Sequence, residues 1–362
     1  MLEMTEQTHF DRRLESMRGV AVLIVALHIG LCAFSGSPTG YEIAIFRIVD
    51  WLLAITSPTA AITFCFVLSG YVLGNSVVRP VNFFIHATRR ALRLLPMFVV
   101  SVVFAFLCIR YVRVEQQPAD LTVFFSKIVF PAPTVEQLLD NLMMSSARVN
   151  ALSWPIPPEL IGSIFMMPLV NLHRSLPVLN SWIVVLIFST ILAFTGFRVV
   201  VWFYFGFVLV PWFATLIKQF RFGPIAAFAI GYTALQYTVL ELDFTYSFRV
   251  IMPTSIGASL MIAAIVSNAA FLARFGAPAL RWIGRISYSF LLLYWPIFYL
   301  CWVSYMQTNF PHGVTGNLVI CSASIALTLI TSYVTYLAVE RPFIRLGRRL
   351  SEGTSQTPRF VT

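Results

Sequence analysis

The sequence predicts an all-α fold: a polytopic membrane bundle of about ten transmembrane helices with the N- and C-termini in the cytoplasm. Hydrophobic residues make up 58% of the 362 residues and charged residues only 11%, against roughly 45–50% and 25% in soluble domains. The mean hydropathy is +0.81. The few charges also fall in clusters that separate uncharged runs of about 20 residues, the length of a helix that crosses a bilayer.

This composition excludes several classes of protein. So few charges cannot cover a water-soluble surface, so we exclude a soluble enzyme, a secreted disulfide scaffold and a disordered regulator. The net charge of +10 could suit nucleic acid, but the basic residues sit in short clusters between apolar runs, as membrane anchors do. We therefore expect membrane lipids and no nucleic acid as partners. The five cysteines lack metal-ligand spacing, so we predict no metal site.

The charge-free gaps place the spans in order along the chain. The predicted spans lie within 18–42, 50–79, 93–110, 159–174, 174–198, 198–218, 221–241 and 249–274, with two more in 285–340, divided near 307–317. The third is short and begins at Pro96. The fourth extends upstream through Pro157 and Pro158, because proline is well tolerated in the first turn of a helix.

The lysines and arginines set the orientation. With a cytoplasmic N-terminus, 18 of the 25 lie in inner segments and 7 in outer ones, as the positive-inside rule requires. Residues 1–350 then form one membrane domain, and 351–362 form a flexible tail. Residues 111–158 form an outer-face loop with short helices, including an amphipathic stretch at 135–144.

His28 is the clearest candidate for chemistry. It lies ten residues beyond Arg18, about 15 Å deeper at 1.5 Å per residue. A histidine inside the bilayer can take a proton from a hydroxyl or carry an acyl group. It can equally make an interhelical hydrogen bond as neutral imidazole.

An arginine cluster begins the third span. Arg89, Arg90 and Arg93 form a set of donors suited to phosphates, because guanidinium binds them bidentately. The alternative is an anchor that contacts anionic lipid. Glu159 opens the fourth helix at its outer end, where it could orient a histidine, accept a proton or simply cap the helix.

Two further motifs favour structural roles. Ser69 and Gly70 lie inside the second span, where small residues permit close helix packing or leave room for a substrate. At 340–343 a charge pair and a proline end the last span.

In this order the motifs resemble the acyltransferase type-3 family of integral membrane O-acyltransferases. Its opening signature, an acidic residue, Leu-Arg-Gly, an apolar run and a histidine, is similar to 15–19 followed by His28. Other blocks of the family resemble 66–70, 89–96, 154–159, 284–289 and 340–343. The likeness covers the whole chain.

The resemblance implies an enzyme of the bacterial inner (plasma) membrane. Members move an acyl group, commonly acetyl, from acyl-coenzyme A onto a hydroxyl of a cell-envelope polysaccharide, lipid or small molecule. Acyl-coenzyme A is then a co-substrate, with no cofactor bound permanently.

The resemblance also implies roles for residues. His28 would be catalytic, and the coenzyme A phosphates would bind Arg18, Arg89, Arg90 and Arg93. Glu159 is the second catalytic candidate, on its position at the start of the fourth helix. Three residues are expected to contact the substrates: Trp154, Ser69 and Tyr288.

The sequence departs from the family at two places. Nine residues separate Arg18 from His28, where the family commonly has ten, so the two point roughly 80° apart on a regular helix at 100° per residue. A local bulge or the length of the arginine would have to restore the geometry. Many members also carry a histidine after the Ser-Tyr-Ser block, where this chain has Tyr294.

Two other functions remain open at this point. A transporter or flippase for a lipid-linked saccharide would use the same basic clusters to hold a pyrophosphate, although the chain shows no related halves. A catalytically inactive scaffold would fit the altered spacing.

Overall fold

The computed structural model describes residues 12–33, 42–76, 82–112, 121–122, 126, 129, 132–175, 199–236, 248–308 and 313–352. Within them the regular elements are helices. Seven helical segments of this part of the chain are long and apolar enough to cross a membrane. The protein is therefore an all-α, polytopic helical membrane protein, as the sequence predicted.

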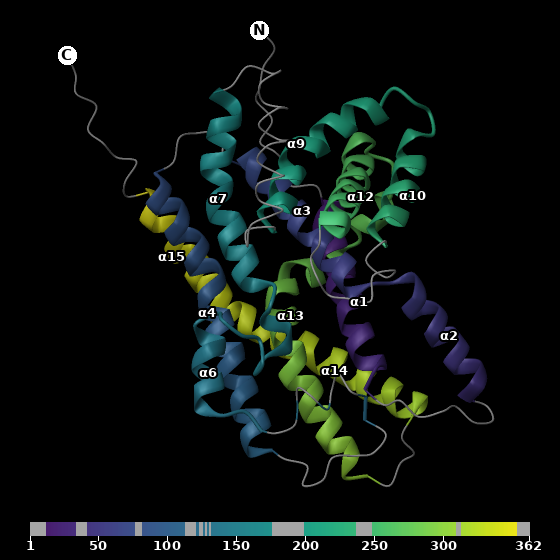
Figure 1. Cartoon of the computed structure of the whole chain (residues 1–362), viewed down its shortest axis with the longest axis vertical. Helices are drawn as coiled ribbons and strands as arrows, with labels where there is room; N and C mark the ends of the chain where they lie inside the picture. The colour runs from purple at the N-terminus through teal and green to yellow at the C-terminus, as the bar shows by residue number, and fades with distance from the viewer. Residues whose placement is uncertain are drawn as a thin grey trace.

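The helices follow one another as shown in Figure 1. The longer ones are α1 (Arg12–Leu31), α2 (Glu42–Ile55), α3 (Pro58–Ser76), α4 (Phe83–Tyr111), α6 (Val135–Leu142), α7 (Ile156–Ser175), α9 (Val199–Ile217), α10 (Gly223–Leu235), α12 (Phe248–Ser267), α13 (Pro278–Met306), α14 (Val314–Thr335) and α15 (Arg341–Glu352). Two short 3₁₀ turns, η1 (Ala151–Ser153) and η2 (Ala273–Gly276), and a π-helical turn, η3 (Tyr336–Glu340), complete the set.

Several predicted spans coincide with helices. The run at 198–218 contains α9, those at 159–174 and 249–274 overlap most of α7 and α12, and the long run at 285–340 divides between α13 and α14. The run at 221–241 contains α10, which has 13 residues. The amphipathic stretch at 135–144 contains α6, whose first turn is closed by a capping box between Thr134 and Gln137. The span predicted at 174–198 and the tail at 351–362 fall almost entirely outside the described residues.

The second predicted run, 50–79, contains α3 but also a helix break that was not predicted. The chain forms α2 up to Ile55 and begins a new helix, α3, at Pro58. The break has a local cause, because proline has no N–H and disfavours a helical conformation in the residue before it. Ser57 then caps α3, accepting a hydrogen bond from the Ala60 N–H at 3.2 Å.

The third predicted span was wrong in its length. α4 begins at Phe83, after Asn82 accepts a hydrogen bond from the Phe84 N–H at 2.9 Å, and it continues through Pro96 to Tyr111. Pro96 therefore lies inside the helix instead of starting it. Arg89, Arg90 and Arg93 consequently lie on the same rigid helix as the apolar segment that follows them.

Glycines bring α1 close to α13. A Cβ atom at Gly19 would lie 2.8 Å from the Leu280 carbonyl oxygen, and one at Gly284 would collide with the Glu15 carbonyl group. Small residues at such crossings allow the backbones of membrane helices to approach. The crossing places Glu15 and Arg18 beside the first half of α13.

A second glycine crossing joins α3 to α9. A Cβ atom at Gly70 would collide with the Phe203 backbone, and one at Gly206 with the Val67 carbonyl oxygen. Gly70 thus serves packing, the role that the sequence favoured for this motif. The contact fixes the α3 segment that carries the neighbouring Ser69 against α9.

α4 and α15 run side by side, with α7 next to α4 (Figure 1). α9, α10 and α12 pack together at the opposite side of the bundle. The helices α1, α3, α4, α7, α13 and α15 therefore surround one region, and the candidate site lies there.

Candidate active site

A cavity of about 390 Å³ lies among α1, α3, α4, α7, α13, η3 and α15. Its charged lining residues are five arginines and three glutamates: Arg18, Arg90, Arg93, Arg285, Arg348, Glu15, Glu159 and Glu340. They come from segments far apart in the sequence. A cavity with this excess of guanidinium groups inside an apolar bundle is suited to an anion.

Arg18 occupies the α1 side of the cavity. Its Nη2 donates a hydrogen bond to the Ser69 Oγ at 3.1 Å, and Arg93 and Glu159 lie within electrostatic range of its guanidinium. Ser69, an expected substrate contact, thus lines the cavity and also holds Arg18. This bond leaves other donors of the guanidinium available to a ligand, since arginine carries five N–H groups.

Arg90 and Arg93 supply the α4 side. They stand three residues apart, so their side chains share one face of the helix. Neither makes a hydrogen bond or an ion pair with any residue of the described chain, yet both line the cavity. Two guanidinium groups are therefore presented to a ligand without being bonded to another described residue.

Arg89 does not line this cavity. It is exposed, and its Cα and Cγ lie 3.5 and 3.6 Å from the position that a Cβ of Gly347 on α15 would take. One residue turns a helix by about 100°, so Arg89 and Arg90 cannot share a face. The structure separates the expected phosphate-binding set into three arginines inside the cavity and one outside.

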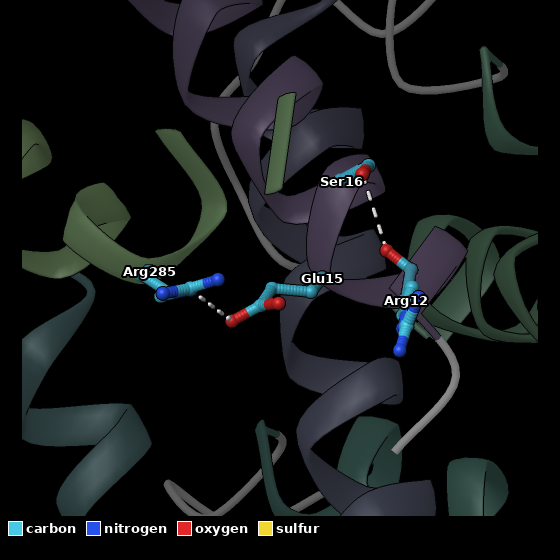
Figure 2. A network of polar contacts seen from close by, with 4 residues as sticks. All are labelled: Arg12, Glu15, Ser16 and Arg285. Atoms are coloured by element: carbon cyan, nitrogen blue, oxygen red, sulfur yellow. Dashed lines mark hydrogen bonds and ion pairs between the residues drawn. The ribbon is translucent and has the colours of Figure 1, made fainter. Parts of the chain in front are cut away.

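Two of the three glutamates already have partners. Figure 2 shows Glu15 on α1 facing Arg285 on α13, and the Glu15 Oε1 and Arg285 Nε are 3.6 Å apart. Glu340 is buried at the end of the π-helical turn and accepts a hydrogen bond from the Ser289 Oγ at 2.7 Å. π-Helical turns are common at functional sites.

Glu159 differs from the other two carboxylates. It lies in the first turn of α7, where the helix dipole favours a negative charge, and it lines the cavity. Within the described chain its carboxylate makes no hydrogen bond and no ion pair. Its oxygens are therefore open to accept a proton from a ligand in the cavity.

The position of Glu159 also bears on the expected membrane depth. The sequence placed it at an outer helix end, distant from the arginines at the start of α4. In the structure α7 runs antiparallel to α4. The His86 Nε2 lies 2.9 Å from the Ser163 carbonyl oxygen, whereas Phe98, further along α4, lines a pocket together with Pro157 in the first turn of α7. Glu159 therefore shares a cavity with Arg90 and Arg93 instead of facing them from the opposite side of the membrane.

Tyr288 and Trp154 lie at the edges of this arrangement. The Tyr288 hydroxyl donates to the Leu94 carbonyl oxygen at 2.6 Å, so it ties α13 to the α4 wall of the cavity. Trp154 follows η1 and lines a second cavity, together with Pro157 and Pro158. Neither side chain lines the arginine cavity.

His28 lies near the C-terminal end of α1. It is half-buried and does not line the arginine cavity. Its Nδ1 is 3.4 Å from the Thr56 Oγ1, and the Thr56 hydroxyl donates its hydrogen to the Leu52 carbonyl oxygen at 2.7 Å. The oxygen of Thr56 can then only accept from His28, so Nδ1 carries the proton. The other ring nitrogen, Nε2, keeps its lone pair and can act as a base.

The sequence did not identify Thr56 as a partner of His28. It falls at the break between α2 and α3, which the charge-free run did not reveal. The Thr-Ser-Pro run at 56–58 carried the signal, because Ser or Thr before Pro is typical of a helix start.

No bulge turns Arg18 and His28 onto one face of the helix, since α1 is α-helical throughout.

Residues 11–337 match the acyltransferase type-3 family, whose shared region is described as an acyltransferase domain. The match covers most of the chain, so the protein belongs to this family and is a membrane acyltransferase. No characterised protein and no solved structure gave a match. Membership in an enzyme family favours catalysis over the carrier and scaffold functions.

Proposed function

We propose that this acyltransferase moves an acyl group, most simply acetyl, from acyl-coenzyme A to a hydroxyl of a cell-envelope polysaccharide, lipid or small molecule in the bacterial inner membrane. One observation carries the choice of donor: Arg90 and Arg93 line the cavity, and within the described part of the chain their guanidinium groups make no hydrogen bond and no ion pair. Coenzyme A carries phosphate groups that supply acceptors for them.

The donor binds with its phosphates among Arg18, Arg90 and Arg93. The cavity lining carries five guanidiniums against three carboxylates, and Glu15 and Glu340 are engaged by Arg285 and Ser289. The field that remains favours an anion. The positive-inside rule puts this end of α4 on the cytoplasmic face, where acyl-coenzyme A is made.

His28 receives the thioester end of the donor. It lies about 15 Å along α1 from Arg18, and the flexible pantetheine arm of coenzyme A is long enough to cover such a separation. The neutral Nε2 takes the proton of the acceptor hydroxyl. The oxygen then attacks the thioester carbonyl carbon, the C–S bond breaks, and the imidazolium returns the proton to the departing thiolate.

Two variations of this step involve the same residues. His28 can first accept the acyl group on Nε2 and pass it to the acceptor oxygen, releasing coenzyme A in the first half-reaction. Glu159 lies with the arginines and not with His28, so its role is to receive a proton inside the cavity and not to orient the imidazole. Trp154, Ser69 and Tyr288 complete the substrate surroundings.

The test has two measurements on one purified protein. Coenzyme A should raise its melting temperature, and inorganic sulfate at equal ionic strength should not. Mass spectrometry of envelope carbohydrate and lipid from cells with and without the protein should then reveal an added acyl group and its acceptor. A protein that coenzyme A does not stabilise, in cells whose envelope acylation is unchanged, would exclude the proposal.

A further inference from the structure

The arginines that line the cavity fall into two groups by exposure. Three are half-buried in the bundle: Arg18, Arg90 and Arg93. The other two, Arg285 and Arg348, are exposed and still line the cavity, so they stand at its mouth. Arg285 faces Glu15, with 3.6 Å between its Nε and the Glu15 Oε1. Neither the sequence motifs nor the proposed function gives a task to Arg348, which lies on α15.

Arg348 ends a row of side chains that lines the cavity. Tyr336, Glu340, Ile344 and Arg348 follow one another at intervals of four residues, from the π-helical turn η3 into α15. Side chains four residues apart lie on one face of a helix. Glu340 is buried, Ile344 is half-buried and Arg348 is exposed. From Glu340 onward the row therefore runs from the interior of the cavity to its mouth.

Gly347 sets the direction of Arg348. A Cβ atom at Gly347 would lie 3.5 Å from the Arg89 Cα, so α15 and α4 are in contact at these two residues. The next residue along each helix is an arginine, Arg348 on α15 and Arg90 on α4, and each is turned about 100° away from the contact. Both line the cavity. The two guanidinium groups are therefore presented to the same ligand from adjacent helices.

The anionic groups of coenzyme A lie in a matching order. The pyrophosphate joins the pantetheine arm to the nucleoside, and a separate phosphate monoester lies beyond it on the 3′ oxygen of the ribose. Because the arm extends along α1 towards His28, the pyrophosphate belongs among the half-buried arginines and the ribose lies towards the mouth. A phosphate monoester carries about 1.5–2 negative charges at neutral pH. When it loses water at the mouth, a cationic partner there stabilises it.

The volume of the cavity agrees with this order. Pockets for drug-sized ligands have about 300–1,000 Å³, and this cavity, of about 390 Å³, lies near the lower end of that range. Coenzyme A is larger than most drugs. Part of the molecule therefore stays outside, and the part opposite to the reacting thioester is the nucleotide.

We propose that Arg348 binds the 3′-phosphate of coenzyme A and thereby selects free acyl-coenzyme A as the donor. The inference rests on the proposed function and names the group of the donor that determines specificity. A guanidinium group binds a phosphate through two parallel N–H···O hydrogen bonds. A phosphopantetheine arm carried on a protein, or a coenzyme A without the 3′-phosphate, offers no such group to Arg348. Such donors should therefore bind more weakly.

The experiment compares coenzyme A with 3′-dephospho-coenzyme A, which lacks only this phosphate. Isothermal titration calorimetry measures both Kd values for the full protein in phosphatidylcholine nanodiscs, as wild type, Arg348→Gln and Arg349→Gln. Arg349 provides the matched control, because it is the next residue of α15, is exposed and does not line the cavity. The wild type is measured again with phosphatidylglycerol in the nanodiscs, since the phosphate of an anionic lipid is the competing ligand for Arg348.

We expect the wild type to bind coenzyme A about tenfold or more tightly than 3′-dephospho-coenzyme A, as the loss of one charge-assisted contact implies. Arg348→Gln should remove this preference, with binding of coenzyme A weakened about tenfold and binding of the dephospho compound changed by less than about threefold. Arg349→Gln should keep both Kd values within about threefold of the wild type, because it removes only an exposed charge outside the cavity.

The wild type tests the inference without any variant, because equal binding of the two compounds overturns it. Equal weakening of both compounds in Arg348→Gln overturns it too. So does a preference that disappears with phosphatidylglycerol, since a lipid phosphate is then the ligand of Arg348. A wild type that binds neither compound refutes the proposed function, and this inference with it.

Discussion

The two ends of α1 carry the two most prominent polar residues of the first helix in very different surroundings. Arg18 lines a cavity with eight charged side chains, itself included, and donates to Ser69 in the middle of α3. His28 lies about 15 Å further along, where its described polar contact is Thr56 at 3.4 Å. Charged side chains surround Arg18, whereas the surroundings of His28 are nearly apolar.

The difference assigns separate tasks to residues that the sequence presents as one motif. Because α1 is regular, Arg18 and His28 point roughly 80° apart, and each finds its own partner beside α3. The charged end is suited to hold the phosphates of a donor. At the apolar end His28 stands apart from the charged cavity, with a ring nitrogen that can accept a proton in the neutral form of the imidazole. Donor binding and proton transfer should therefore respond independently to mutation.

Loss of the arginine pair should have the largest effect. In Arg90→Gln/Arg93→Gln the cavity loses two charge-assisted contacts, each about 1.5–3 kcal/mol, so we expect the Kd for coenzyme A to rise by about 100-fold or more. Isothermal titration calorimetry of the protein in nanodiscs measures this directly. Arg89→Gln, which removes a neighbouring charge outside the cavity, should change the Kd less than threefold.

Comparison of Arg89→Gln with the double variant tests whether Arg90 and Arg93, and not Arg89, bind the donor. Equal losses from Arg89→Gln and from the double variant would mean that the donor lies across the outer surface of α4 and not in the cavity. Arg221→Gln, at an exposed arginine next to Phe222, controls for the general loss of positive charge.

The second largest effect should come from His28. His28→Gln keeps a polar side chain but has no proton acceptor of comparable basicity, so we expect kcat for acyl transfer to fall by roughly 100- to 1,000-fold. The Kd for coenzyme A should stay within threefold of the wild type, because His28 does not line the donor cavity. A variant that loses coenzyme A binding together with transfer would contradict the separation of the two ends of α1.

The sequence predicted the fold class and much of the candidate site, because both depend on local signals. Long uncharged runs report membrane helices whatever their packing, and Arg90, Arg93 and Glu159 stood out because charges are rare in such a chain. Their assembly into one cavity could not be predicted, since it requires α7 to run antiparallel to α4 and α15 to lie beside α4. Orientation and neighbours of helices depend on side-chain packing that no single segment encodes.

Two residues show more closely what could not be predicted about the site from the sequence. Glu340 was interpreted as part of a structural helix end, yet it lines the cavity because a π-helical turn ends there. Arg89 belonged to the predicted phosphate-binding set, and only the rotation of α4 turns it away. A motif therefore identifies the residue types of a site, and helix rotation decides which of them reach it.

Mutation of Glu159 should have a smaller effect than mutation of the arginine pair or of His28. It should alter both coenzyme A binding and acyl transfer. Glu159→Gln keeps the size of the side chain and removes its negative charge, so we expect coenzyme A to bind slightly more tightly, by about two- to fivefold, as a repulsive charge leaves the cavity. If Glu159 also receives a proton during transfer, kcat falls by roughly 10- to 100-fold. Stopped-flow binding and steady-state transfer separate the two quantities. Weaker coenzyme A binding would contradict the open carboxylate that the structure places beside the arginines.

The smallest effect is expected for mutation of Thr56. It tests whether Thr56 sets the tautomer of His28 and so contributes to proton transfer. Thr56→Val preserves the shape of the side chain but removes the oxygen that accepts the His28 Nδ1–H, so the proton is free to move to Nε2 and block the base. The loss of one neutral hydrogen bond, about 0.5–1.5 kcal/mol, corresponds to a fall in kcat of roughly 3- to 10-fold. Thr56→Ser keeps the hydroxyl and should restore kcat. A merely structural Thr56 would lower the melting temperature in Thr56→Val and leave kcat and its pH profile unchanged, whereas a residue that sets the tautomer of His28 alters kcat without affecting the Kd for coenzyme A.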